Sequence, residues 1–300
     1  MLEESMALLL PAGDGRPAVY VDATFGAGGH TEALLLRSRG SRVIALDADP
    51  AAVARAQDLG RRYPGRVDAV HSNYGRLGEI LDERGVREAD GIMYDLGLSS
   101  LQLADSARGF SFAGVEPLDM RLDPTSSGPT AAKLLAEMTQ RDLADLIERH
   151  GDERYARRIA RSIVWRRERA PLETTSDLVA AVLSAQPKGV ARGRRGIHPA
   201  TRTFQALRMA VNDESSNLER SLDAALSHVR PGGRIVAISF HSGEDRVVKR
   251  AFRASKDAGR SELLTRKPLT PGPDELEHNP RARSAKLRAV AIADTKQEAT

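Results

Sequence analysis

The stretch Val21-Asp-Ala-Thr-Phe-Gly-Ala-Gly-Gly-His30 decides the fold of this 300-residue chain. It continues a short apolar segment that ends in an acid, Asp22, and it precedes a helical pattern at 31–37. Glycines here let the backbone approach a ligand and adopt positive φ, and the first turn of a helix offers free N–H donors. We therefore predict a strand, a ligand-binding glycine-rich turn and a helix; a tight turn without a ligand is the alternative.

The segments that follow repeat the same alternation. Strand patterns lie at 18–22, 42–47, 67–70 and 91–95, and helical patterns lie at 31–37, 50–62 and 77–84. Strands that alternate with helices at this spacing indicate a parallel sheet covered on both faces. Further strands are expected at 234–240, 261–266 and 286–292, after a helix at 217–229 and a turn at 231–233. The predicted fold is a doubly wound, seven-stranded α/β domain of the Rossmann-like type.

The alternation stops after the fourth strand. Residues 101–175 contain no convincing strand pattern, and helices are expected at 130–149, 152–168 and 176–183. We therefore assign residues 1–103 and 210–300 to the sheet domain. Residues 104–209 are expected to form an inserted, all-helical domain that recognises the substrate.

The composition excludes several classes of protein. The chain has no cysteine, which excludes disulfides, zinc fingers, iron–sulfur clusters and thiol nucleophiles. No apolar run approaches the ~20 residues that a membrane helix needs, and the acidic start of the chain does not resemble a secretory signal. We expect a cytoplasmic protein that does not bind a membrane. The 7 histidines show no metal-binding spacing, so no metal is expected.

Two acids narrow the identity of the ligand at the turn. Asp47 ends the second strand, where sheets of this type bind ribose hydroxyls. A dinucleotide would favour the pattern G-x-G-x-x-G, but the third glycine is missing and Asp22 stands beside the turn. A carboxylate repels pyrophosphate and attracts an ammonium or sulfonium group, so S-adenosylmethionine is the predicted cofactor. Tyr74, just after the third strand, is either an adenine contact or an ordinary surface or core tyrosine.

Asp95 lies at the carboxyl end of the fourth strand, the edge at which such sheets bind ligands. Amino-methyltransferases hold their target amine at this position, although their Asp/Asn/Ser-Pro-Pro-aromatic turn is replaced here by Asp95-Leu-Gly-Leu-Ser-Ser100. Asp95 is the candidate amine acceptor, and Ser99 is a candidate substrate contact. His241, after the fifth strand, is another candidate or a structural histidine. The sequence around Ser99 does not form a nucleophile elbow, so nucleophilic catalysis by a serine with His241 is not expected.

Arginines gather in the predicted helical domain. They lie at positions 154, 157, 158, 161, 166, 167, 169, 192, 194, 195, 202 and 208, the first seven beside an apolar stripe at helical spacing. Such clusters are typical of phosphate binding. The candidate substrate contacts are Arg157, Arg161, Arg195, His198 and Arg202. Few aromatic residues interleave, so phosphate and shape reading is expected more than base stacking. The alternative is a solvated face whose arginines pair with Glu153 and Glu168.

Eight stretches spread over the chain carry a family resemblance. They are DATFGAGGH (22–30), DGIMYDLGLSSLQ (90–102), RGFSF (108–112), LDMRLDP (118–124), HPATRTFQALR (198–208), VNDE (211–214), SFHSGEDR (239–246) and NPRARSAKLR (279–288). With them the chain resembles the RsmH/MraW family, which methylates N4 of cytidine 1402 in bacterial 16S ribosomal RNA. The family usually has leucine where this chain has Gly243, so the match is weaker around His241.

The resemblance implies a function, partners and a site. It implies methyl transfer from S-adenosylmethionine to a cytidine N4 in the decoding centre of 16S ribosomal RNA, in the small ribosomal subunit; a homodimer is compatible with it. It implies cofactor contacts at Gly28, Gly29, His30, Asp47, Tyr74, Asp95 and Gln102, of which spacing alone would not have selected His30 or Gln102. Two alternatives stay open: a DNA amino-methyltransferase, and a non-catalytic, cofactor-bound ribosome-assembly factor.

Overall fold

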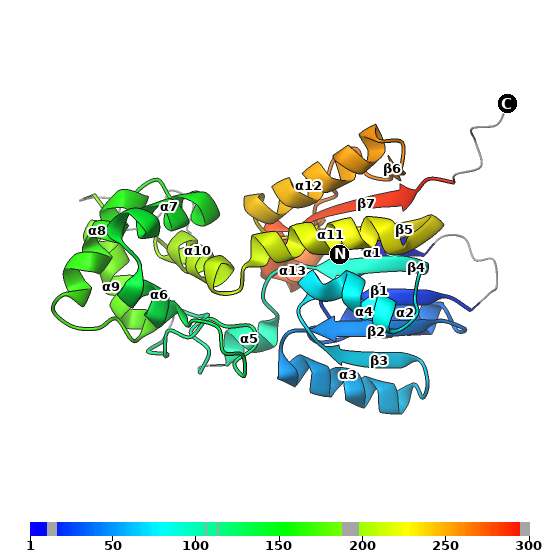
Figure 1. The fold of residues 1–300 in the computed structure, drawn as a ribbon, viewed down its shortest axis with the longest axis horizontal. Coiled ribbons are helices and arrows are strands. Elements are labelled where there is room, and N and C mark those ends of the chain that lie inside the picture. The colour runs from blue at the N-terminus through cyan, green and yellow to red at the C-terminus, as the bar shows by residue number, and fades with distance from the viewer. Residues whose placement is uncertain (11–16, 106, 113, 188–197, 295–300) are drawn as a thin grey trace. The chain divides into compact units, whose positions relative to one another are not determined.

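The computed structural model describes residues 1–10, 17–105, 107–112, 114–187 and 198–294 (Figure 1). The chain divides into two compact units, Met1–Gly97 with Ser215–Thr300, and Leu98–Glu214. The sequence-based boundaries were expected at 103/104 and 209/210. Across the described ranges, no helix has both the length and the hydrophobicity of a membrane-spanning segment.

The first unit is built on a seven-stranded sheet in the order β3-β2-β1-β4-β5-β7-β6. The strands are β1 (Val19–Asp22), β2 (Arg42–Asp47), β3 (Val67–His71), β4 (Ala89–Asp95), β5 (Val229–Ser239), β6 (Ser261–Leu263) and β7 (Lys286–Ile292). β1 to β5 are parallel, and β7 pairs antiparallel with β5 and β6. The predicted α/β class is confirmed. The strand order changes direction between β1 and β4, the switch point where sheets of this kind bind ligands.

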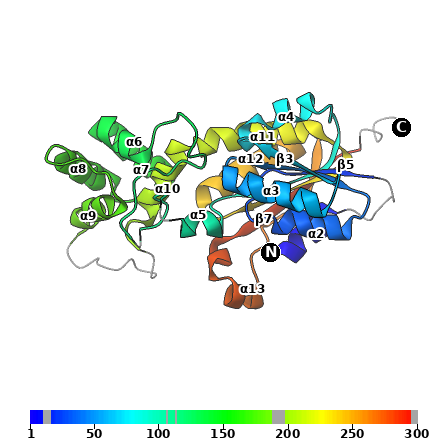
Figure 2. The ribbon, with the colours of Figure 1, turned by 90° about the horizontal axis from the view of Figure 1, so that it is seen from below.

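Helices cover both faces of this sheet. One core joins the strands to α1 (Leu2–Leu9), α2 (Gly29–Arg37) and α3 (Pro50–Arg62), and a second joins them to α4 (Leu77–Glu83), α11 (Glu214–His228) and α12 (Ser242–Asp257). Figure 2 shows α2 and α3 on one side of the strands and α4 and α11 on the other. Because the sheet is covered twice, β4 is buried from Ala89 to Tyr94. The short helix α13 (Pro273–His278) and the 3-10 turns η1 (Tyr74–Arg76) and η2 (Pro280–Ser284) complete the unit.

We predicted a turn at 231–233 and the start of the fifth strand at residue 234, and this prediction is wrong. β5 begins at Val229 and includes these residues, with a shift of register against β4 between Ala89 and Gly91. Gly233 makes this irregular start feasible, because a Cβ there would lie 2.5 Å from Val229 Cγ1. A proline and two glycines therefore mark a bulge within the strand rather than a separate turn.

The second unit is built of helices: α5 (Ser100–Ala104), α6 (Ala131–Glu137), α7 (Gln140–Gly151), α8 (Ala156–Arg167), α9 (Thr175–Ala185) and α10 (Thr201–Val211). The single helix expected at 130–149 is wrong. Thr139 adopts an extended conformation and accepts a hydrogen bond from Asp142 N at 3.2 Å, so it ends one helix and caps the next. The apolar sides of α6 to α10 share one core, which includes Ile159 of α8.

Candidate active site

The glycine-rich turn connects β1 to α2. Gly28 caps α2 in the left-handed conformation, with φ of 86°. A Cβ at Gly28 would lie 2.5 Å from Cζ of Phe25, whereas a Cβ at Gly29 would meet no atom within 4 Å. Phe25 N donates to Leu46 O of β2 at 2.9 Å, which fixes the turn to the neighbouring strand. Position 28 therefore requires glycine for conformation, while the space over Gly29 is open.

Three adjacent strands bring three acids to this turn. Asp22 ends β1, Asp47 ends β2 and Asp95 ends β4. Asp47 Oδ2 accepts from Gly26 N at 2.7 Å and Asp47 Oδ1 accepts from Asp49 N at 2.8 Å. Burial nevertheless raises the pKa of Asp47. The structure therefore brings the three predicted acids to one edge of the sheet, and Asp47 also shapes the turn.

Asp22 is buried and well satisfied. Its Oδ2 accepts from Thr31 Oγ1 at 2.7 Å, and its Oδ1 accepts from Thr24 N at 3.2 Å. Burial raises the pKa of the Asp22 carboxyl, and the nearby imidazole of His30 and these hydrogen bonds oppose that rise. Asp22 thus fastens β1 to the first turn of α2. Its carboxyl also lies next to the glycine-rich turn.

His30 and Asp95 form a pair beside Asp22. His30 Nδ1 lies 3.5 Å from Asp95 Oδ2. Among the described residues, the buried atoms His30 Nε2 and Asp95 Oδ1 have no hydrogen-bond partner. Burial raises the pKa of Asp95 to about 7 and lowers the pKa of His30. A buried polar atom without a partner costs free energy, so these two atoms are the ones that a bound ligand would satisfy.

This edge of the sheet fits S-adenosylmethionine. Three carboxylates gather at this edge, where they can attract a positively charged group, and the space over Gly29 is open. Each carboxylate oxygen of Asp47 keeps acceptor capacity for a ribose hydroxyl, because one oxygen can accept two hydrogen bonds. The ring of Tyr74, in η1 after β3, meets the ring of Tyr94 edge-on at 6.3 Å between centroids. The half-buried Tyr74 is thereby held at the end of β3.

Gln102 and Ser99 belong to the second unit, where they cap α5. Ser99 N donates to Gln102 Oε1 at 3.0 Å, and Gln102 N donates to Ser99 Oγ at 3.2 Å. This reciprocal pair is a capping box, a structure that the spacing Ser-x-x-Gln could have predicted. Contacts from these residues to cofactor or substrate stay predictions.

His241 caps α12. Its Nδ1 accepts from Glu244 N at 3.3 Å, and Glu244 Oε2 accepts in return from Phe240 N at 2.8 Å. These contacts give His241 a structural role, which was the alternative to substrate contact. The signal in the sequence is again a capping spacing, His241-x-x-Glu244.

Arg157 and Arg161 are exposed on α8. Within the part of the chain that the structure describes, neither forms an ion pair with a carboxylate. Glu153, one of the two acids proposed to neutralise them, is buried and its Oε1 accepts from Tyr155 N at 2.8 Å. No ion pair joins this face to Glu153 or Glu168 among the described residues, so the expected pairing is wrong, and a solvated face without these pairs stays the alternative to phosphate binding.

The other three predicted substrate contacts are Arg202, His198 and Arg195. Arg202 donates to Asp152 O at 2.9 Å, which joins α10 to the end of α7, although its side chain stays exposed. His198 stacks on Phe112, with 4.5 Å between ring centroids. Arg195 lies outside the described residues.

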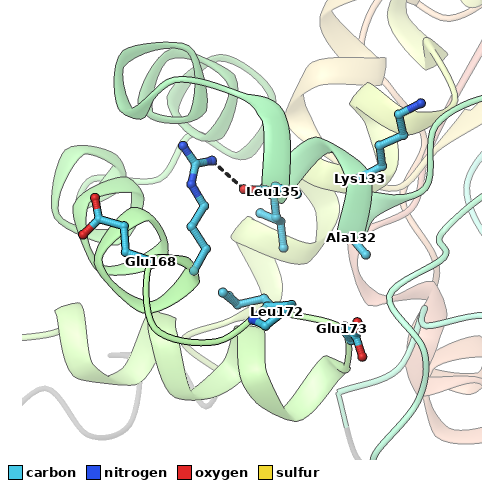
Figure 3. Close-up of a pocket in the computed structure, with 9 residues that line it drawn as sticks. Ala132, Lys133, Leu135, Glu168, Leu172 and Glu173 are labelled. Atoms are coloured by element: carbon cyan, nitrogen blue, oxygen red, sulfur yellow. Dashed lines mark hydrogen bonds between the residues drawn. The ribbon is translucent and has the colours of Figure 1, made fainter.

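A pocket in the second unit carries none of the predicted site residues (Figure 3). Its lining comes from α6, from the end of α8 and from the segment after it: Ala132, Lys133, Leu135, Ala136, Arg167, Glu168, Pro171, Leu172 and Glu173. Arg167 donates to Leu135 O at 2.6 Å and to Met138 O at 2.7 Å. The guanidinium is therefore used to satisfy carbonyls at the end of α6.

Comparison with known proteins shows the family of this chain. The family model of the MraW methylase family matches residues 1–293. A protein of Thermomicrobium roseum named Ribosomal RNA small subunit methyltransferase H is 48% identical over 306 residues, covering 97% of this chain and 91% of the relative. A protein of the same name from Sorangium cellulosum is 50% identical over 287 residues, covering 96% and 88%. The solved structure of the N-methyltransferase NodS from Bradyrhizobium japonicum WM9 aligns at a TM-score of 0.42 and 10% identity, covering 98% and 94%.

The match runs through both units, and the relatives are aligned over nearly their full length. The residues at the switch point suit a positively charged methyl donor, and membership of a methylase family agrees with S-adenosylmethionine, the cofactor that the sequence predicts. The chain belongs to the MraW methylase family.

Proposed function

We propose that this enzyme transfers a methyl group from S-adenosylmethionine to N4 of a cytidine in 16S ribosomal RNA, at the position equivalent to cytidine 1402. The relatives that carry the name of a small-subunit ribosomal RNA methyltransferase support the substrate class. The observation that supports the chemistry best is Asp95 at the end of β4, with Oδ1 buried and without a partner among the described residues.

The cytidine N4 amine needs help to act as a nucleophile, because its lone pair is delocalised into the ring. The bound cofactor supplies an electrophilic methyl carbon on a sulfonium. The protein must hold the amine about 3–3.5 Å from that carbon. An acceptor for the N4–H bonds would favour a pyramidal nitrogen, and in this proposal Asp95 Oδ1 is that acceptor.

The electrostatics of the pair suit proton transfer near neutral pH. A carboxyl with a pKa of about 7 is present in its basic form for half of the molecules at pH 7, and a catalytic base works best with a pKa near the working pH. His30 has a pKa lowered by burial, so its imidazole is neutral and can orient the Asp95 carboxyl through Nδ1. In the proposal, Asp95 is the catalytic residue and His30 its positioning residue.

The RNA must present its cytidine unpaired or flipped out of the helix, because N4 is engaged in a base pair otherwise. The arginines of α8 would bind phosphates of the same RNA. Arg157 and Arg161 are exposed and form no ion pair in the described part of the chain, as this role requires.

The test is methyl transfer from labelled S-adenosylmethionine to three acceptors: free 16S ribosomal RNA, the assembled small subunit, and cytosine-containing DNA. The proposal expects label on cytidine N4 of one or both ribosomal acceptors and none on DNA. Label on DNA alone would support the DNA amino-methyltransferase. Cofactor and RNA binding without turnover would support a non-catalytic assembly factor.

A further inference from the structure

An exposed row of three arginines and one tryptophan runs along α8 and its C-terminal extension. Arg157, Arg161, Trp165 and Arg169 are spaced by four residues, so they lie on one side of the helix about 6 Å apart along its axis. All four are exposed, and Trp165 as a residue is 53% exposed. We call these four residues the α8 row.

In the part of the chain that the structure describes, no carboxylate neutralises the positive charge of the α8 row. Like charges four residues apart on a helix destabilise it. Arg157 and Arg161 therefore lower the stability of α8 when no anionic partner is bound. Elsewhere on α8, Arg167 donates to carbonyls of α6, whereas Arg157 and Arg161 make no such contact among the described residues.

The aromatic member of the row is held in place from one side. The Arg169 guanidinium lies 3.7 Å from the centroid of the Trp165 ring, and Arg169 Nη1 donates to Trp165 O at 2.6 Å. One face of the indole is therefore covered by a cation, and the ring is oriented before any ligand binds. An ordered indole flanked by unpaired arginines combines the two features with which proteins bind unpaired nucleic acid: stacking of bases and attraction of the backbone.

We propose that the α8 row binds an unpaired stretch of RNA, with one nucleobase stacked on the open part of Trp165 and neighbouring phosphates on the arginines. This inference rests on the proposed action on ribosomal RNA and extends it to a stacking contact that the sequence did not predict. The arginines favour a negatively charged partner. The exposed indole favours a partner that also carries flat aromatic groups, as RNA does, over a partner with acidic groups alone.

Trp165 is the single tryptophan of the chain, so its fluorescence reports on this position alone. The test titrates the full enzyme with oligoadenylate, with an abasic oligomer of equal phosphate number, and with polyglutamate. The proposal expects oligoadenylate to quench Trp165 and the abasic oligomer to bind without comparable quenching. Equal quenching by abasic oligomer or by polyglutamate would contradict stacking; the latter would favour an acidic protein partner.

Three variants separate stacking from folding. Trp165→Leu should weaken oligoadenylate binding about five- to tenfold or more, as loss of one base–aromatic stack does, and leave the abasic oligomer unaffected. Trp165→Phe should restore most of the affinity. Leu183→Ala, which removes another exposed apolar side chain of the same unit, is the matched control and should change neither. A Trp165→Leu enzyme with lower melting temperature but wild-type affinity would assign Trp165 to structure alone.

Methyl transfer by the same preparations keeps this inference distinct from the proposed function. Wild-type enzyme that methylates ribosomal RNA while Trp165 ignores oligoadenylate would overturn the stacking contact only. Wild-type enzyme that transfers no methyl to either ribosomal acceptor would overturn the proposed function, whatever Trp165 reports.

Discussion

Replacing Asp95 with asparagine separates two roles that this side chain could serve. Asparagine keeps the size and one acceptor oxygen but loses the negative charge. In one role the Asp95 carboxylate stabilises charge that develops on the cytidine N4. In the other it holds the amine or adenosine side of the cofactor, as the family resemblance suggests. We favour the first role because Asp95 Oδ1 is buried without a partner among the described residues while Oδ2 already faces His30.

The two roles predict different kinetics for Asp95→Asn. Loss of a transition-state contact should lower kcat by about 10²-fold or more even at saturating cofactor, which corresponds to ~2.7 kcal/mol. A cofactor role would instead raise the cofactor dissociation constant, and saturating cofactor would restore most of kcat. Single-turnover methyl transfer, combined with calorimetric titration of the cofactor, measures both. A variant with near-normal kcat and cofactor affinity would refute both roles.

The pH dependence gives Asp95→Asn an independent readout. Since burial raises the pKa of Asp95 to about 7, the wild-type rate should rise with pH and level off above that value. The variant should lose this limb. The raised pKa also means that the charged carboxyl destabilises the folded state. Wild-type stability from this group is complete below pH ~4 and is lost as pH rises through 7, so Asp95→Asn should gain melting temperature relative to wild type at pH 8 and not at pH 4.

Three further changes probe the turn and the cationic face. Asp47→Ala should weaken cofactor binding by ~1–3 kcal/mol, the cost of leaving buried ribose hydroxyls unpaired; unchanged affinity in calorimetry would contradict the ribose role. Gly28→Ala should lower the melting temperature, because φ is 86° and the new Cβ would meet the ring of Phe25. The matched control Gly29→Ala should keep the wild-type melting temperature and weaken only cofactor binding. Equal melting temperatures of the two variants would contradict the conformational role of Gly28. Arg157→Ala with Arg161→Ala should reduce the salt dependence of RNA binding by about one log–log slope unit or more and spare cofactor binding; wild-type affinity at every salt concentration would restore the solvated-face interpretation.

The arrangement of the acids could be predicted because it follows from chain direction. Parallel strands place their carboxyl ends at one edge, so Asp22, Asp47 and Asp95 had to converge once the strands were identified. The contact between His30 and Asp95 could not be predicted in this way. It depends on how the first turn of α2 is rotated against β4, which the hydrogen bonds of Asp22 and the turn decide.

The helix boundaries and caps were not predicted, because side-chain hydrogen bonds to the backbone can end a helix where the hydrophobic pattern continues. The apolar periodicity of 130–149 continues across Thr139, yet the hydroxyl of Thr139 caps a new helix there. Ser99 and His241 were selected as chemically able side chains, whereas their spacing to Gln102 and Glu244 makes them helix caps. Trp165 was not selected from the sequence, although it lies four residues from Arg161 and from Arg169; the structure adds that its ring is exposed and that Arg169 covers one face.

The most direct test of the account is to map the methyl group itself. After reaction of 16S ribosomal RNA and of assembled small subunits with labelled S-adenosylmethionine, nuclease fragments are sequenced and the modified nucleoside is identified by mass spectrometry. The account predicts one methyl on N4 of a single cytidine, equivalent to position 1402, and its loss with Asp95→Asn. A methyl on carbon, on ribose or on another base would contradict the chemistry assigned to Asp95.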